Sequence, residues 1–164
     1  MLGQFILIIV GGLVVGVAAI ATAVLLGVRA RVPVAVDALR RFSRLFNPLA
    51  MRTAGSRGAS TSVVRHVGRK SGRAYATPVD AVPTEDGFVI ALPYGSRSHW
   101  VRNVLAEGTA TIVDDGRTYS VDHPELIPFG MVAAQFPPSD QRSLRRFRVE
   151  HCLRVRRVGT AEAA

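Results

Sequence analysis

The sequence of 164 residues has a single cysteine, Cys152, so no disulfide can form within the chain. Its four histidines do not stand at spacings typical of zinc ligands: His151 is adjacent to Cys152, and no two histidines are four residues apart. The sequence therefore predicts no metal site. The low cysteine content also agrees with a reducing cytoplasm.

Lysine is equally scarce. Of the 21 lysine and arginine residues only Lys70 is a lysine, and with 12 acidic residues the net charge is +9. A charge of this sign permits a basic adaptor for anionic lipid or nucleic acid, and we keep this as an alternative. We expect no nucleic-acid partner, because no row of aromatic residues offers bases a stacking surface.

Charge of either sign is absent from Phe5 to Val28. These 24 residues would span roughly 36 Å as a helix, enough to cross a bilayer core of about 30 Å. A signal peptide would carry positive charge before a shorter apolar core, and a buried helix would be amphipathic. Residues 1–28 are therefore predicted to be a single transmembrane helix. Gly12 and Gly16 are spaced as in membrane helices that pair, which leaves a homodimer open, although glycine is common in membrane helices.

Arginines follow this segment at once, beginning with Arg29 and Arg31. By the positive-inside rule, the remainder of the chain lies in the cytoplasm and the protein is a single-pass protein of the plasma membrane. Residues 36–46 have the apolar spacing of a short basic helix, which could lie on the anionic membrane surface or pack on the domain. Small polar residues at 53–60 predict a linker, so residues 29–60 are assigned to a juxtamembrane region.

From residue 61 the sequence predicts a mainly β domain that ends at 158, with a disordered tail over 159–164. Strands are expected at 61–67, 74–84, 88–94 and 149–158, and a hairpin at 109–122 with Asp115-Gly116 as its turn. A helix is expected at 98–108, capped by Ser98 and ended by Gly108, and short helices within 129–147. The nearly continuous apolar run 88–94 predicts a central strand. This order favours a small antiparallel barrel over a doubly wound sheet, which needs a helix between successive strands.

The only lysine lies in the sequence Gly-Arg-Lys-Ser-Gly-Arg, residues 68–73, between the first two predicted strands. Gly68 and Gly72 allow backbone N–H groups to turn toward an anion. The side chains add three cations and a hydroxyl, a set suited to phosphate. The spacing of a P-loop is absent. From the residues alone, a phosphate site and an ordinary polar turn both remain open.

Three motifs in order resemble the deazaflavin-dependent nitroreductase family of the split β-barrel superfamily: "GRKSGR…TPV", a hydrophobic strand ending in "YG", and "WVRNVLAEG". The resemblance covers about residues 62–128. It implies a six-stranded antiparallel split β-barrel with two or three short helices, which binds coenzyme F420 (8-hydroxy-5-deazaflavin). It also implies hydride transfer from the reduced coenzyme to quinones, nitroaromatics or other activated acceptors.

The resemblance further implies a role for particular residues. The coenzyme's phosphate and acidic tail would be held by Arg69, Lys70 and Ser71, with Gly72 shaping the turn and Arg73 adding charge. The deazaflavin ring would lie along Thr77, Pro78 and Val79, with Tyr94 and Gly95 at its other edge. Trp100 and Asn103 would lie on the helix beside the phosphate loop.

The sequence departs from the family's pattern in two places. Leu92-Pro93 stand where relatives often have Ser or Thr, and residues 129–147 contain phenylalanine but no tyrosine. An apolar pocket lined by Phe129, Phe136 and Phe147 would suit a lipid-like acceptor such as menaquinone. Tyr94 is the candidate proton donor to the reduced acceptor. The alternative is a barrel of the same fold that uses FMN or binds its ligand without turnover.

Overall fold

The computed structural model describes residues 22–23, 26–27 and 51–163, with side chains up to Gly159. The chain divides into two units, Met1–Phe42 and Ser43–Ala164. The predicted membrane span and the predicted basic helix lie outside the described residues, apart from 22–23 and 26–27, which are helical. No helix within the described ranges is long and apolar enough to cross a membrane.

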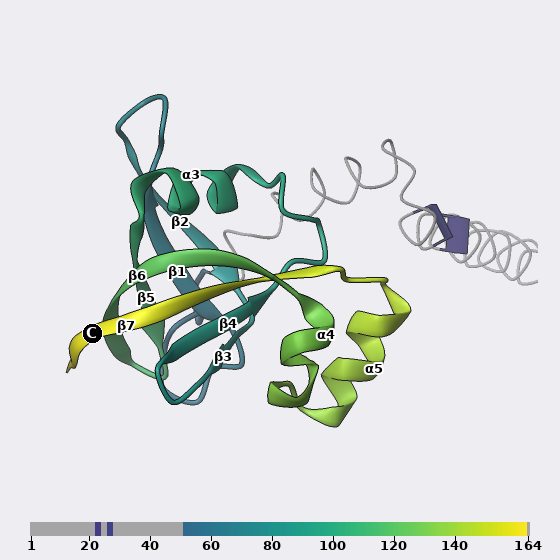
Figure 1. Cartoon of the computed structure of the whole chain (residues 1–164). Helices are drawn as coiled ribbons and strands as arrows, with labels where there is room; N and C mark the ends of the chain where they lie inside the picture. Colours follow the sequence, from purple (N-terminus) through teal and green to yellow (C-terminus); the bar gives the residue numbers. More distant parts are fainter. Residues whose placement is uncertain (1–21, 24–25, 28–50, 164) are drawn as a thin grey trace, which may run out of the picture. The chain divides into compact units, whose positions relative to one another are not determined.

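The described part of the second unit is mainly β, as predicted. Its strands form one antiparallel sheet in the order β2-β1-β5-β6-β7-β4-β3 (Figure 1). The strands are β1 (Ser62–Val67), β2 (Ala74–Val79), β3 (Ala81–Pro83), β4 (Gly87–Ala91), β5 (Thr109–Asp114), β6 (Arg117–Pro128) and β7 (His151–Ala163). The helices are α3 (His99–Glu107), α4 (Phe129–Val132), the 3₁₀ turn η1 (Ala133–Gln135) and α5 (Pro138–Arg146).

The expected number of six strands is wrong, because the predicted strand 74–84 is two strands. Only Asp80 separates β2 from β3, yet these strands form opposite edges of the sheet. The sheet must therefore curl until its two edges approach each other at Asp80. Pro78 lies in β2 and Pro83 in β3, where a missing backbone N–H is tolerated because both are edge strands.

Two apolar clusters lie on the two faces of this curled sheet. Inside the curl, Phe88, Ile90 and Leu153 pack with buried residues of α3 such as Val101. On the other face, Val89 and Cys152 pack with residues of α4 and η1. The apolar run of β4 thus reflects two covered faces rather than the predicted central position, since β4 is the second strand from an edge.

Local sequence signals placed most other elements well. Helix α3 ends at Gly108, whose φ of 77° is the left-handed value that glycine adopts readily. The hairpin turn has positive φ at both Asp115 and Gly116, as a type I′ turn requires. Ser98 occupies the N-cap position, but its hydroxyl donates to the carbonyl of Gly95 instead of capping the helix. Strand β7 continues to Ala163, beyond the expected end at 158.

Candidate functional site: the β1–β2 loop and helix α3

The loop formed by residues 68–73 joins β1 to β2 and projects from the end of the sheet that α3 covers (Figure 1). There is no room for a side chain at Gly68, because a Cβ there would lie 2.6 Å from both Ser71 Oγ and Tyr75 Cε2. Gly72 has a φ of 64°, which disfavours other residues. The two glycines are therefore explained by the shape of the loop.

Most backbone N–H groups of this loop, including those of both glycines, donate to acceptors within the protein, whereas the sequence suggested that they turn toward an anion. Those of Ser71 and Gly72 donate to the carbonyl of Gly68, and the N–H of Gly68 donates to the carbonyl of Arg73. The N–H of Arg73 donates to Ser71 Oγ at 3.4 Å. The loop's capacity to bind an anion therefore rests on its side chains.

The cations of the loop lie at the surface. Arg69, Lys70 and Arg73 are exposed, and none of the described Asp and Glu residues forms an ion pair with them. Exposed cations without a carboxylate partner keep their full charge available to an external anion. Ser71 adds a hydroxyl that lies 3.2 Å from the Tyr75 hydroxyl. This donor set fits a phosphodiester with a carboxylate tail.

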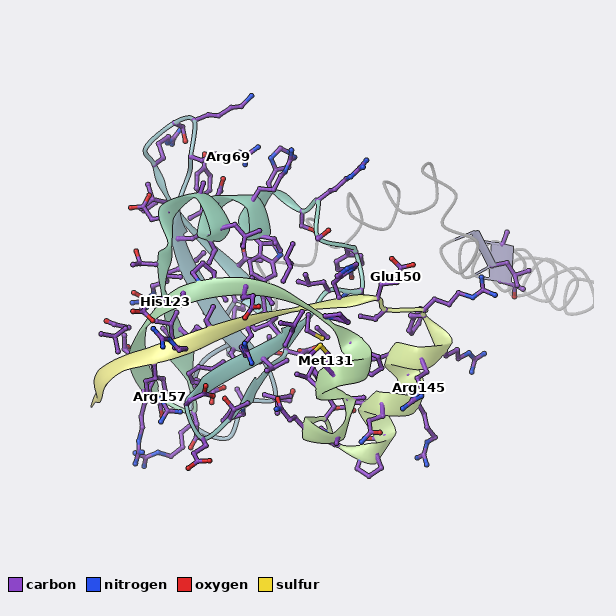
Figure 2. All side chains as sticks on the ribbon, viewed as in Figure 1. Arg69, His123, Met131, Arg145, Glu150 and Arg157 are labelled. Carbon is purple, nitrogen blue, oxygen red and sulfur yellow. The ribbon has the colours of Figure 1, made fainter. Side chains whose placement is uncertain are left out.

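Asn103 of α3 attaches this loop to the helix. Its Oδ1 accepts hydrogen bonds from the Arg69 guanidinium at 2.8 Å and from the Arg69 backbone N–H at 3.3 Å. The guanidinium also donates to the carbonyl of His99, in the first turn of α3. Figure 2 shows Arg69 between the loop and α3. Asn103 is buried and lies where the resemblance placed it, beside the loop.

The other side of the Asn103 amide faces His66, a buried residue of β1 that the sequence did not single out. Asn103 Nδ2 lies 3.2 Å from His66 Nδ1, and His66 Nε2 lies 3.2 Å from Thr77 Oγ1 on β2. Burial lowers the pKa of the His66 imidazole, although a hydrogen bond to the backbone of Val67 opposes this effect. Position 66 shares the inward face of β1 with Val64, which was the only sequence signal for it.

Tyr75 is a second residue that sequence reasoning missed. It pairs with His66 across β1 and β2, and the two rings stack with centroids 5.8 Å apart. Its ring is 46% exposed and its hydroxyl reaches Ser71. Tyr75 therefore forms an aromatic surface between the cationic loop and Thr77.

The remaining residues of the predicted site are spread more widely. Pro78 is half-buried on β2, whereas the side chain of Val79 is buried in the core and presents no surface to a ligand. Trp100 packs partly against the same core. Tyr94 and Gly95 lie in the turn between β4 and α3, where the Gly95 N–H donates to the carbonyl of Leu92. Hydrogen bonds thus join Arg69, Asn103, His66 and Thr77. Ser71 is hydrogen-bonded to Tyr75, whose ring stacks on His66.

The predicted pocket lined by phenylalanines is wrong. Phe129 and Phe136 are buried and pack against each other with ring centroids 5.8 Å apart. Phe147 packs partly against the same cluster. Met131, in the same helix as Phe129, is by contrast 77% exposed. These rings therefore belong to a packed core rather than to the lining of a pocket.

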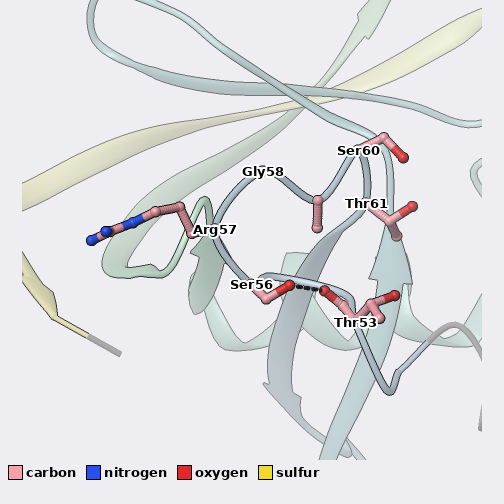
Figure 3. A pocket seen from close by; sticks show the side chains of 7 residues that line it. Thr53, Ser56, Arg57, Gly58, Ser60 and Thr61 are labelled. Carbon is pink, nitrogen blue, oxygen red and sulfur yellow. Dashed lines mark hydrogen bonds between the residues drawn. The ribbon is translucent and has the colours of Figure 1, made fainter.

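A surface hollow of about 400 Å³ lies elsewhere, beside the segment 53–61 that precedes β1 (Figure 3). The side chains that line it are small and mostly neutral. The Ser56 hydroxyl already donates a hydrogen bond to the carbonyl of Thr53 at 2.6 Å. The segment is attached to the β5–β6 turn through Gly58 N–H and Asp115 Oδ1. Arg57 is the only charged residue in its lining, so this hollow has little to hold a charged ligand.

One of the solved structures compared with this chain supports the fold. HutZ of Vibrio cholerae, described as a haem storage protein, superposes with a TM-score of 0.52 at 12% identity, over 65% of this chain and 87% of that one. At this identity the likeness concerns the fold alone. An F420-H2 dependent reductase, FDR-A, gives a TM-score of 0.44 at 17% identity, over 61% of this chain and 95% of the other. The protein Rv2991 of Mycobacterium tuberculosis superposes with a TM-score of 0.45 at 10% sequence identity, over 65% of this chain and 78% of that one.

No curated protein matches the sequence. A family match is nevertheless present and covers more than half of the chain: residues 43–128 match the family described as F420H(2)-dependent quinone reductase. The matched range includes the 68–73 loop, β2 and α3, and so contains every residue of the predicted site. The chain therefore belongs to the F420H(2)-dependent quinone reductase family and is an oxidoreductase that uses reduced coenzyme F420.

Proposed function

We propose that this chain is a membrane-tethered reductase that transfers a hydride from reduced coenzyme F420 to a quinone such as menaquinone. Nitroaromatics and other activated apolar compounds are further acceptors. The observation that carries the proposal is the exposed cluster of Lys70 and Arg73, which lacks a carboxylate partner among the described residues and lies next to β2 and α3. The coenzyme's phosphodiester and glutamate tail supply the matching negative charges.

The chemistry that the coenzyme supplies when bound is a hydride, which carries two electrons and one proton. A quinone that accepts this hydride needs one more proton to become a hydroquinone. Tyr94 is our candidate for delivering that proton, from the turn that precedes α3. The remaining residues of the site bind and orient: Lys70 and Arg73 hold the anionic portion, while Tyr75 and Thr77 present a ring and a hydroxyl on β2.

The membrane tether is supported by the uncharged segment Phe5 to Val28 and by the arginines that follow it. These features favour a single span with the domain on the cytoplasmic side of the plasma membrane. A tether in that place keeps the domain near lipid-soluble quinones. Because the phenylalanines of 129–147 are packed into a core, we place the acceptor over the exposed side of the coenzyme at β2 rather than beside α4.

The full chain, reconstituted in vesicles, would be mixed with reduced coenzyme F420 and menaquinone, and both would be followed by absorbance. We expect one coenzyme to be oxidised for each quinone reduced. Reduced FMN serves as the parallel donor and a nitroaromatic as the parallel acceptor. Coenzyme binding without oxidation would indicate a ligand-binding protein, and turnover with FMN alone would support the FMN-using alternative.

A further inference from the structure

The hydrogen-bond pattern around Asn103 determines which way its amide points. An arginine side chain and a backbone N–H can only donate, so the Asn103 atom that faces both groups of Arg69 must be the oxygen. The atom that faces His66 is therefore the NH₂ group. Because this group can only donate, His66 Nδ1 must offer a lone pair.

The same reasoning extends to Thr77. A neutral imidazole whose Nδ1 carries no proton has its proton on Nε2, and Nε2 lies 3.2 Å from Thr77 Oγ1. His66 therefore donates to the threonine oxygen. The hydroxyl proton of Thr77 must then point away from His66, toward the half-exposed side of β2.

We propose that His66 is a positioning residue that connects the anion-binding loop to Thr77 and makes the Thr77 hydroxyl a hydrogen-bond donor to an acceptor atom of the bound coenzyme. This inference rests on the proposed function, because it places the coenzyme along β2. The connection is continuous: Arg69 donates to Asn103, Asn103 to His66 and His66 to Thr77. Each link fixes the direction of the next.

Burial supports this role. His66 and Asn103 are 6% and 7% exposed, so neither can exchange its partner for water without cost. The groups that face the imidazole are the Tyr75 ring and Thr77 hydroxyl from β2, the Asn103 amide from α3 and the backbone of Val67 on its own strand. The only cation in this connection is Arg69, reached through Asn103. A proton added to Nδ1 would confront the NH₂ group of Asn103, so protonation of His66 breaks the connection.

The first test needs no coenzyme. Nitrogen NMR of the ¹⁵N-histidine-labelled full chain at neutral pH reports which ring nitrogen carries the proton. We expect His66 to have its proton on Nε2 throughout, and Asn103→Ala to let the tautomer with a proton on Nδ1 appear beside it. A proton on Nδ1, or on both nitrogens, in the wild-type chain would overturn the proposal.

The second test is a double-mutant cycle on the dissociation constant of oxidised coenzyme F420. Thr77→Val and His66→Phe should each weaken binding by about tenfold, as loss of one hydrogen bond does. If His66 acts through Thr77, the double variant should also lose about tenfold, and not the roughly hundredfold expected of independent residues. Independent effects would overturn the proposal.

Conservative variants separate positioning from folding. Thr77→Ser retains the hydroxyl, and His66→Gln places an amide donor near the position of Nε2, so both should bind within about threefold of wild type. Below pH 6.5, wild-type binding should weaken as His66 becomes protonated, and the His66→Gln variant should lack this step because its amide does not titrate. Equal losses in His66→Gln and His66→Phe, or a pH step that survives both, would overturn the proposal. If wild type binds no coenzyme, the proposed function fails as well, whereas the NMR result is independent of it.

Discussion

The two ends of the domain are built on opposite principles. At one end, α3 and the β1–β2 loop are joined by buried polar groups, with Asn103 and His66 at the centre. At the other end lie α4 and α5 (Figure 1), where apolar side chains such as Phe129 and Phe136 pack against the sheet. Polar networks fix direction, whereas apolar packing contributes free energy without selecting one ligand geometry. This contrast is why we place ligand recognition at the α3 end.

The largest effect is expected at the apolar end. Phe129→Ala should lower the free energy of unfolding by about 3–5 kcal/mol, because it removes a buried ring from a packed cluster. Chemical denaturation of the full chain measures this loss. The control is Met131→Ala on the same helix, which should change stability by less than about 0.5 kcal/mol since Met131 is exposed. If Phe129→Ala were as stable as wild type but bound quinone more weakly, this result would support the phenylalanine-lined acceptor pocket instead.

A smaller loss of stability, with a loss of binding, is expected at the polar end. Asn103→Ala should lower the free energy of unfolding by about 1–3 kcal/mol, because it leaves the buried imidazole of His66 without a partner and removes the hydrogen bonds from Arg69. Coenzyme affinity should fall with it, since the loop loses its attachment to α3. Both quantities are measured on the same preparation, by denaturation and by titration.

Asn103→Asp tests the contact between residue 103 and His66 separately from the contact with Arg69. The carboxylate still accepts from Arg69, but it can no longer donate to His66 and favours a proton on Nδ1. The pKa of His66 should therefore rise relative to wild type, as followed by NMR titration. An unchanged pKa would contradict the contact between these side chains.

The smallest effect concerns Cys152, in the apolar cluster of α4. Burial raises the pKa of its thiol to about 11 from the ordinary value of 9.0. The folded state therefore favours the neutral thiol. Its stabilising contribution is complete below pH 9 and is lost as the pH rises toward 11. The melting temperature of wild type should decline more steeply than that of Cys152→Ala over this range, and parallel curves would contradict the assignment.

Local signals in the sequence predicted the fold better than the site. The Asp115-Gly116 turn and the end of α3 at Gly108 depend on backbone preferences of single residues, and both were correct. The division of 74–84 into β2 and β3 depends on which partners each half finds, which no local pattern encodes. Burial of Phe129 and Phe136 was missed for a related reason, since an aromatic residue is equally suited to a core and to a pocket.

The site shows the same division. The motif at 68–73 indicated the cations, and the resemblance placed Asn103 beside them. The backbone N–H groups could not be predicted, because the hydrogen bonds that take them up form only once the loop has closed on itself. His66 and Tyr75 were missed because their role depends on cross-strand pairing, which brings together residues nine positions apart.

The most direct test of the account is titration of the full chain with coenzyme F420, in wild type, Lys70→Ala and Arg142→Ala. Arg142 is an exposed arginine on α5, so its removal alters net charge equally but at the other end of the domain. We expect Lys70→Ala to weaken binding by about tenfold, as loss of a charge-assisted contact does, and Arg142→Ala to leave it unchanged. Equal affinities in all three proteins would contradict the assignment of the β1–β2 loop as the coenzyme's anion site.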